Sequence, residues 1–217
     1  MARRSRHRFG ADRRPKGAHP SDGNAFLIKF LNSRRGWGHF GRPSTGQADW
    51  AMVYYAGHGI EVGGTNYLLP VDAQLKTDRD VQFEAVTLDQ VLSSVEGARK
   101  LRIIILDACR NNPFIPEMAR TMTSRSIGRG LARVEPETGG TLVVYATKAG
   151  QVALDGALGQ NNSPFVAALT RNLVKPGLEI NRVFRAVRDD VLAETDRRQE
   201  PFVYGSLPNE DFYFKAP

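Results

Sequence analysis

The sequence predicts an α/β fold built on a mostly parallel sheet. Three short apolar runs, at 50–56, 101–106 and 141–145, are typical of strands that are buried on both faces. Amphipathic helical patterns alternate with these runs, which favours parallel strands joined by helices. The chain has 217 residues, of which 41% are hydrophobic and 24% charged, and this composition suits one globular domain.

The first 48 residues are expected to add little to this sheet. Residues 1–23 form a basic tail that we expect to be disordered. Apolar residues at helical spacing predict a short, divergent helix within 24–31, and the rest of the segment 24–48 is a glycine-rich loop. The main domain is therefore expected to span residues 49–217.

Turn and capping signals define the next elements. A hairpin is expected over 60–62 and 66–69, with its turn at Gly63 and Gly64. Thr87 is the predicted N-cap of an amphipathic helix that follows the hairpin.

The second half of the chain begins with a long polar loop, which we place at 115–140. Ser163 and Pro164 have the residue types of an N-cap and a first helical position. A second amphipathic helix is predicted over 180–191, and a short strand at 212–214 is expected to close the chain.

Charge and cysteine content narrow the class of protein. Residues 1–20 carry seven basic side chains against one acid, so +6 of the net charge of +7 lies in this segment. A nucleic-acid-binding protein is therefore one alternative, but it depends on the tail alone. Neither a membrane span nor an export signal is predicted, so we expect a cytoplasmic protein. Cys109 is the single cysteine, which excludes an intramolecular disulfide and a cysteine-cluster zinc site, and no other metal site is predicted.

His58 and Cys109 each follow the C-terminal end of a predicted buried strand. The carboxyl ends of neighbouring parallel strands meet at one edge of a sheet, so the spacing places an imidazole near a thiol. Such a dyad supports acyl transfer, because a thiolate attacks a carbonyl and the histidine protonates the leaving amine. The backbone amides of Gly59 and Cys109 are candidate donors to the oxyanion. Taken singly, a buried cysteine and a structural histidine are the better explanations of these residues, but the two together favour the dyad.

Three motifs carry a family resemblance: YYAGHG at 54–59, NYLLPVDA at 66–73 and LDACRNNPF at 106–114. They closely resemble motifs of the bacterial caspase-like proteins, which are relatives of metacaspases. The histidine of caspases lies about 50 residues before the cysteine, which is close to the separation of His58 and Cys109.

This resemblance implies a three-layer caspase-like (caspase-haemoglobinase) sandwich and a cysteine endopeptidase that acts on proteins or peptides without a cofactor. His58 and Cys109 carry over as its dyad. Caspases have glutamine two residues before the cysteine and cleave after aspartate, whereas Asp107 matches the acid with which metacaspase-like enzymes hold a basic P1 side chain. We therefore expect cleavage after Arg or Lys, with Asp155 as a second candidate for the P1 pocket. The alternative is that Asp107 only caps local backbone amides.

The long loop lies where related proteases are cut between their large and small subunits. A protease with a basic P1 preference has candidate autocleavage sites there, at Arg120, Arg125, Arg129 and Arg133. Ordinary surface arginines in a solvated loop are the alternative.

The family normally begins with a strand and helices ahead of the histidine strand, whereas 21–48 predict one helix and no strand. We therefore expect the N-terminal strands to be missing or divergent and the histidine strand to lie at an exposed edge. The alternative function is a catalytically impaired caspase-like module that binds protein partners. Calcium activates some metacaspases, but no segment has a calcium-loop pattern.

Overall fold

The computed structural model describes residues 48–109, 127–128, 131–136, 139–148, 153–154 and 162–217, and the backbone of 26–31. For Cys109, Ile127 and Gly128 the backbone alone is described. The strands are β1 (Phe26–Leu31), β2 (Trp50–Val62), β3 (Thr65–Leu69), β4 (Val86–Thr87), β5 (Leu101–Cys109), β6 (Ile127–Gly128), β7 (Thr141–Tyr145) and β8 (Phe202–Ser206). The helices are α2 (Val81–Glu84), α3 (Leu88–Val95), α4 (Pro164–Leu173) and α5 (Ile180–Glu194).

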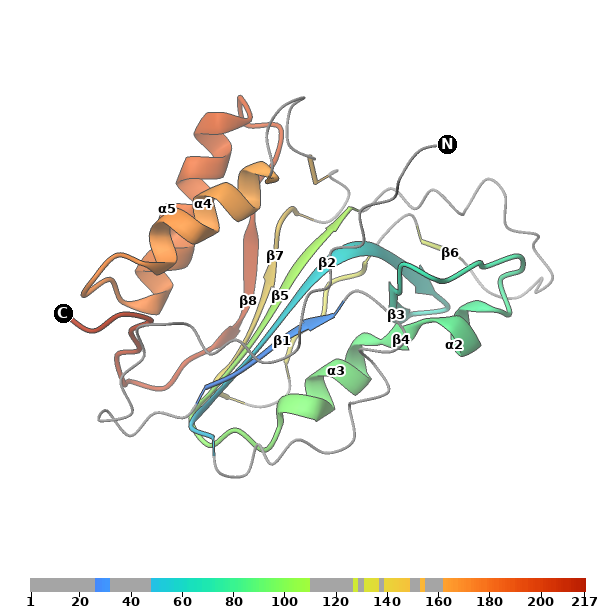
Figure 1. The fold of residues 1–217 in the computed structure, drawn as a ribbon, viewed down its shortest axis with the longest axis horizontal. Helices are drawn as coiled ribbons and strands as arrows, with labels where there is room; N and C mark the ends of the chain where they lie inside the picture. Colours follow the sequence, from blue (N-terminus) through green and yellow to red (C-terminus); the bar gives the residue numbers. More distant parts are fainter. Residues whose placement is uncertain are drawn as a thin grey trace, which may run out of the picture.

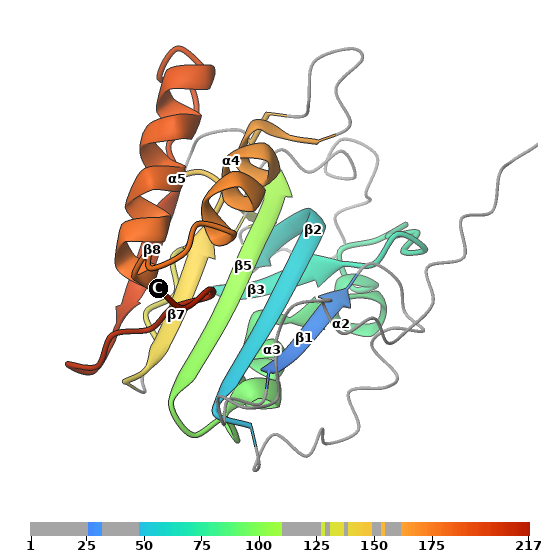
Figure 2. The ribbon, with the colours of Figure 1, turned by 60° about the vertical axis from the view of Figure 1, so that its left-hand side comes forward.

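The described strands form one eight-stranded mixed sheet, in which six strands follow the order β4-β3-β2-β5-β7-β8 and β1 and β6 each pair with β2. Figure 2 shows β2, β5 and β7 side by side at the centre of the sheet. Its centre is parallel, because β5 pairs in parallel with β2 on one side and with β7 on the other. Antiparallel pairs continue the sheet outward, β2 with β3 and then β3 with β4 on one side, and β7 with β8 on the other. The predicted α/β fold with a mostly parallel core is confirmed.

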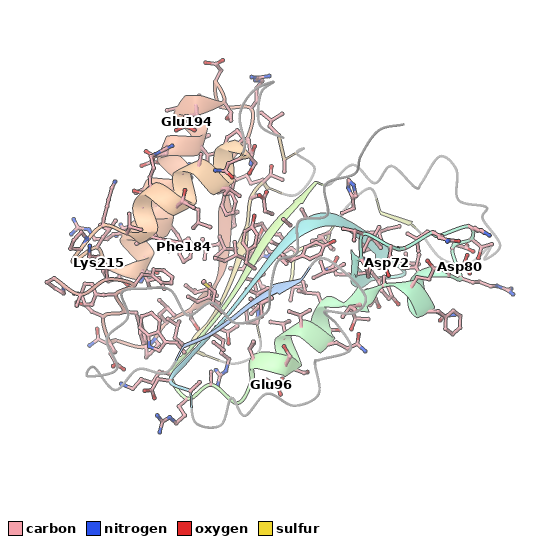
Figure 3. All side chains as sticks on the ribbon, in the orientation of Figure 1. Asp72, Asp80, Glu96, Phe184, Glu194 and Lys215 are labelled. Atoms are coloured by element: carbon pink, nitrogen blue, oxygen red, sulfur yellow. The ribbon has the colours of Figure 1, made fainter. Side chains whose placement is uncertain are left out.

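Helices cover both faces of the sheet and make three layers (Figure 1). Helices α4 and α5 pack on one face, and α3 packs on the other. Figure 3 shows Phe184 and Glu194 of α5 on the opposite side of the sheet from Glu96, which follows α3.

Both faces of the central strands are buried, as the apolar runs predict. On β5, Ile103 and Ile105 face α4 and α5, whereas Ile104 and Leu106 belong to the core beneath α3. All four side chains are at most 1% exposed. A strand enclosed in this way needs apolar residues at consecutive positions, because successive side chains point to opposite faces.

The expected turn and caps are present. Gly63 and Gly64, with φ of 60° and 86°, form the turn between β2 and β3, in a conformation that favours glycine. Thr87 caps α3 in a reciprocal capping box with Gln90, and Ser163 caps α4 by accepting a hydrogen bond from the Val166 amide. These local signals therefore predict their elements correctly.

The expected helix at 24–31 is wrong, because Phe26–Leu31 is the strand β1. It pairs in parallel with the first part of β2, from Trp50 to Tyr55. The later part of β2, from His58 to Val62, pairs with β3. The expectation that the histidine strand lies at an exposed edge is therefore also wrong. A short run of apolar residues fits a buried strand as well as a helix, and an open sheet edge selects the strand.

The expected closing strand at 212–214 is wrong, because these residues form no strand. Phe212 is a buried core residue, and Tyr213 makes an isolated antiparallel bridge with Glu179. The last strand is β8, at Phe202–Ser206, and β2 runs on through the histidine to Val62.

Candidate active site

The strands that end in the candidate dyad are direct neighbours. In the parallel register of β2 and β5, the last pair of Cα partners is His58 and Cys109. Neighbouring strands of a sheet lie about 4.8 Å apart, so the two backbones are adjacent at this position. The prediction that the two residues lie side by side on neighbouring strands is confirmed, although His58 lies within β2 and not after its end.

The Tyr55 hydroxyl fixes the backbone of His58. Its oxygen lies 2.6 Å from the His58 carbonyl oxygen and 2.8 Å from that of Leu69, which share its single proton, and it accepts from the Leu69 amide at 3.0 Å. The Tyr55 side chain is fully buried, and burial raises the pKa of its hydroxyl although the bonds to Leu69 and His58 lower it. The hydroxyl therefore stays protonated at neutral pH and remains a donor beside the histidine.

Gly57 is required by the same tyrosine. A Cβ atom at Gly57 would lie 2.6 Å from the Tyr55 hydroxyl oxygen, closer than atoms in contact can approach. The glycine before His58 therefore leaves room for the hydroxyl that holds the histidine backbone. His58 itself is half-buried, and its Nδ1 atom is enclosed by protein.

Gly59, the candidate oxyanion donor, packs against Leu131, which lies within the predicted long loop at 115–140. A Cβ atom at Gly59 would lie 2.5 Å from Cγ of Leu131, a residue that is 3% exposed. Buried Asn66 of β3 holds the next residue, because its Nδ2 donates to the Ala132 carbonyl at 2.9 Å and its Oδ1 accepts from the Ala132 amide at 2.6 Å. The segment 131–136 is thus fastened behind Gly59.

Asp107, two residues before Cys109, accepts hydrogen bonds from two hydroxyl groups. Its Oδ2 lies 3.2 Å from the Tyr54 hydroxyl and 2.9 Å from Ser163 Oγ. Burial raises the pKa of Tyr54 well above its ordinary value, and the negative charge of Asp107 raises it further. Both donors are side chains more than fifty positions away from Asp107 in the sequence.

A buried glutamine secures the chain after β7. Gln199 is 0% exposed; its Nε2 donates to the Ala146 carbonyl at 2.8 Å, and its Oε1 accepts from the Leu154 amide at 2.9 Å. The side chain therefore joins two points of this connection at the carboxyl edge of the sheet. The next residue, Asp155, lies outside the described residues.

Three of the candidate autocleavage sites, Arg120, Arg125 and Arg129, also lie outside the described residues. Arg133 is described, and its guanidinium lies 4.7 Å from the centre of the Tyr204 ring. It also pairs with Glu135.

Sequence reasoning did not assign the supporting roles of Tyr54, Tyr55, Asn66 and Leu131, although the first three lie in the quoted motifs. The strand pattern contains a signal for the first two, since adjacent tyrosines on one strand must point to opposite faces. Nothing local indicates that Asn66 reaches Ala132 in the predicted long loop, because the two residues are 66 positions apart.

A family model, the caspase domain, matches residues 38–213, which is most of the chain. The chain belongs to the caspase-domain family. This family consists of cysteine peptidases, and its members act on proteins.

Among solved structures, this caspase-domain protein is similar to caspase-1 from Spodoptera frugiperda, with a TM-score of 0.53. The two sequences are 14% identical, and the match covers 89% of this chain and 92% of that one. This likeness shows the caspase-like fold. No curated protein sequence matches the chain.

Neither a metal-binding group nor a membrane-spanning helix is found in the described part of this caspase-domain protein. Within the described ranges, no three side chains of His, Cys, Asp or Glu gather as a group that could hold a metal ion. None of the helices in the described part of the chain is long and apolar enough to span a bilayer.

Proposed function

We propose that this caspase-domain protein is a cysteine endopeptidase with Cys109 as its nucleophile and His58 as its general base and acid. The observation that carries the proposal is the strand register, in which the two residues are Cα partners in the last pair between β2 and β5. A histidine and a cysteine that are paired across neighbouring strands are the residue types that such a dyad needs, because an imidazole can take the proton of a thiol.

The chemistry follows from these two groups. His58 takes the thiol proton, the sulfur of Cys109 attacks the scissile carbonyl carbon, and the protonated imidazole gives its proton to the leaving amine as the C–N bond breaks. Water then attacks the thioester with His58 as base, which releases the carboxylic acid and the free thiol. The amides of Gly59 and Cys109 are the proposed donors to the oxyanion, and the packing of Leu131 behind Gly59 supports the first of them.

We further propose that the enzyme cleaves after arginine or lysine. Asp107 supports this specificity, because its half-buried carboxylate lies at the carboxyl end of β5, two positions before the nucleophile. A carboxylate in a P1 pocket pairs with a cationic side chain, and with arginine through two hydrogen bonds. Asp155 remains the second candidate for this pocket.

Hydrolysis of fluorogenic peptides with Arg, Lys or Asp at P1 tests the proposal. We expect the wild type to cleave the Arg and Lys peptides, the Cys109→Ala and His58→Ala variants to lose this activity, and Asp107→Ala to lose the preference for a basic P1 residue. Each measurement is made with calcium and with a chelator. A wild type that is folded by circular dichroism but cleaves no peptide would favour the protein-binding alternative.

Autocleavage follows from the same specificity. We expect mass spectrometry of the purified wild type to show cuts after Arg120, Arg125 or Arg129, with Cys109→Ala remaining intact. Arg133 should be cut last, because Asn66 holds the backbone of Ala132 and the Tyr204 ring lies against the guanidinium. An intact wild-type chain would contradict this part of the proposal.

A further inference from the structure

The carboxylate of Asp107 is held from two separate elements. Tyr54 reaches it from β2, where Ala56 is the Cα partner of Asp107, so Tyr54 is its diagonal neighbour across the strand pair. A diagonal neighbour in a sheet lies within reach of an aromatic side chain. Ser163 reaches the same oxygen, Oδ2, from the start of α4.

The hydroxyl of Ser163 has a fixed direction. Its oxygen accepts from the Val166 amide, at 3.2 Å, as the cap of α4, so its single proton is available for Asp107. The start of α4 is also the positive end of a ten-residue helix, which favours a negative charge nearby. Both features stabilise Asp107 as the carboxylate.

The hydroxyl of Tyr54 is a second donor to the carboxylate of Asp107. Burial and the charge of Asp107 raise its pKa, so it stays neutral and keeps its proton across the physiological range. An ionised carboxylate only accepts hydrogen bonds, so the proton of Tyr54 points to Asp107. Two donors on one oxygen fix the rotation of the carboxylate about its side-chain bonds and favour its charged form.

We propose that Tyr54 and Ser163 are positioning residues that hold Asp107 as an oriented anion and thereby determine the preference for a basic P1 side chain. The inference rests on the proposed function, since it assigns the P1 pocket to Asp107. It adds that selectivity depends on the strand β2 and on the cap of α4, although neither residue needs to touch the substrate.

A purely structural role makes a different prediction. If the two bonds only tie β5 to β2 and α4, their loss lowers stability and affects charged and neutral P1 side chains equally. If they position Asp107, their loss weakens the binding of arginine but hardly changes the binding of its neutral isostere citrulline. The ratio of the two affinities therefore separates the roles.

The experiment measures binding by calorimetry in the Cys109→Ala background, with two peptides that differ only in arginine or citrulline at P1. Tyr54→Phe removes one donor and leaves the cap of α4 intact. Ser163→Ala removes both the donor and the cap, whereas Ser163→Thr keeps both. Thr87→Ala is the matched control, because it removes the N-cap of α3, which makes no contact with Asp107 in the described structure.

We expect Tyr54→Phe and Ser163→Ala each to reduce the arginine-to-citrulline affinity ratio about tenfold, which is the effect of losing one hydrogen bond to a charged group. Ser163→Thr and Thr87→Ala should retain the wild-type ratio. In the active enzyme, the same two variants should raise KM for the arginine peptide and leave kcat near the wild-type value.

Two results would overturn the inference in distinguishable ways. The first result is a Cys109→Ala protein that clearly prefers arginine and whose affinity ratio stays the same in both Tyr54→Phe and Ser163→Ala. It would refute the positioning role alone. The absence of any arginine preference when Asp107 and its partners are intact would refute the P1 assignment and the inference with it. Circular dichroism and thermal unfolding of each variant show that the folded protein is being compared.

Discussion

Replacing Gly59 with alanine tests the packing behind the histidine strand. The added Cβ would lie 2.5 Å from Cγ, 2.6 Å from Cδ2 and 2.9 Å from Cδ1 of Leu131, all well inside van der Waals contact. Because Leu131 is 3% exposed, its side chain has little space to retreat. Overpacking of this kind costs about 1–3 kcal/mol, so we expect Gly59→Ala to lower the free energy of unfolding by about 2 kcal/mol.

A double-mutant cycle measured by urea unfolding identifies the contact. Leu131→Ala alone should cost about 2–5 kcal/mol, since it removes a buried side chain. It also removes the three atoms that lie nearest to the new Cβ. In the Leu131→Ala background, Gly59→Ala should therefore be neutral, or stabilising by about 0.5 kcal/mol because alanine has less freedom in the unfolded chain.

The coupling energy of the cycle should accordingly be about 2 kcal/mol in magnitude. Equal costs of Gly59→Ala in the two backgrounds would refute the reasoning, since the strain would then have another source. The slope of the free energy against urea should be the same in all four proteins, which shows that the compared states are the same.

Two further predictions concern buried polar groups. Asn66→Ala removes both bonds to the Ala132 backbone, so the free energy of unfolding should fall by about 1–3 kcal/mol and the Ala132 amide should exchange hydrogen faster; unchanged exchange would argue against the clamp. Tyr54 and Tyr55 have raised pKa values, so each stabilises the fold fully below the ordinary value of 10.0, and this contribution is lost as the pH rises above it. Above pH 10, the free energy of unfolding measured with urea should fall by about 1.4 kcal/mol per pH unit for each tyrosine. A Phe variant whose free energy of unfolding fell equally steeply with pH would contradict this.

The elements that the sequence predicts correctly are those with local signals. The hairpin has its glycine pair at 63 and 64, α3 has a capping box, and α4 has serine followed by proline. Each signal involves residues within a few positions of one another, so it acts before any tertiary contact forms. The adjacency of His58 and Cys109 follows from their places on two neighbouring parallel strands. Predicting it therefore needs no knowledge of side-chain contacts.

The elements that were missed depend on distant partners. The run at 26–31 has apolar residues at positions that fit a helix and a strand, and pairing with β2 decides between them. The strand β8 contains Gly205 at φ 124° and follows a proline, so its sequence is a weak strand signal, and it forms because β7 offers it a partner. The two hydroxyls on Asp107 come from residues far apart in the sequence and become visible only when β2, β5 and α4 meet.

The position of α4 and α5 after the central strands in the sequence has a consequence for synthesis on the ribosome. The strands β2, β5 and β7 and the cover helix α3 all emerge before residue 164. The face that carries Ile103 and Ile105 therefore stays bare until α4 and α5 leave the exit tunnel, whereas the opposite face already has its helix. A nascent chain at this stage exposes one apolar face of its sheet, which is the kind of surface that chaperones bind. This surface is covered when α4 and α5 dock.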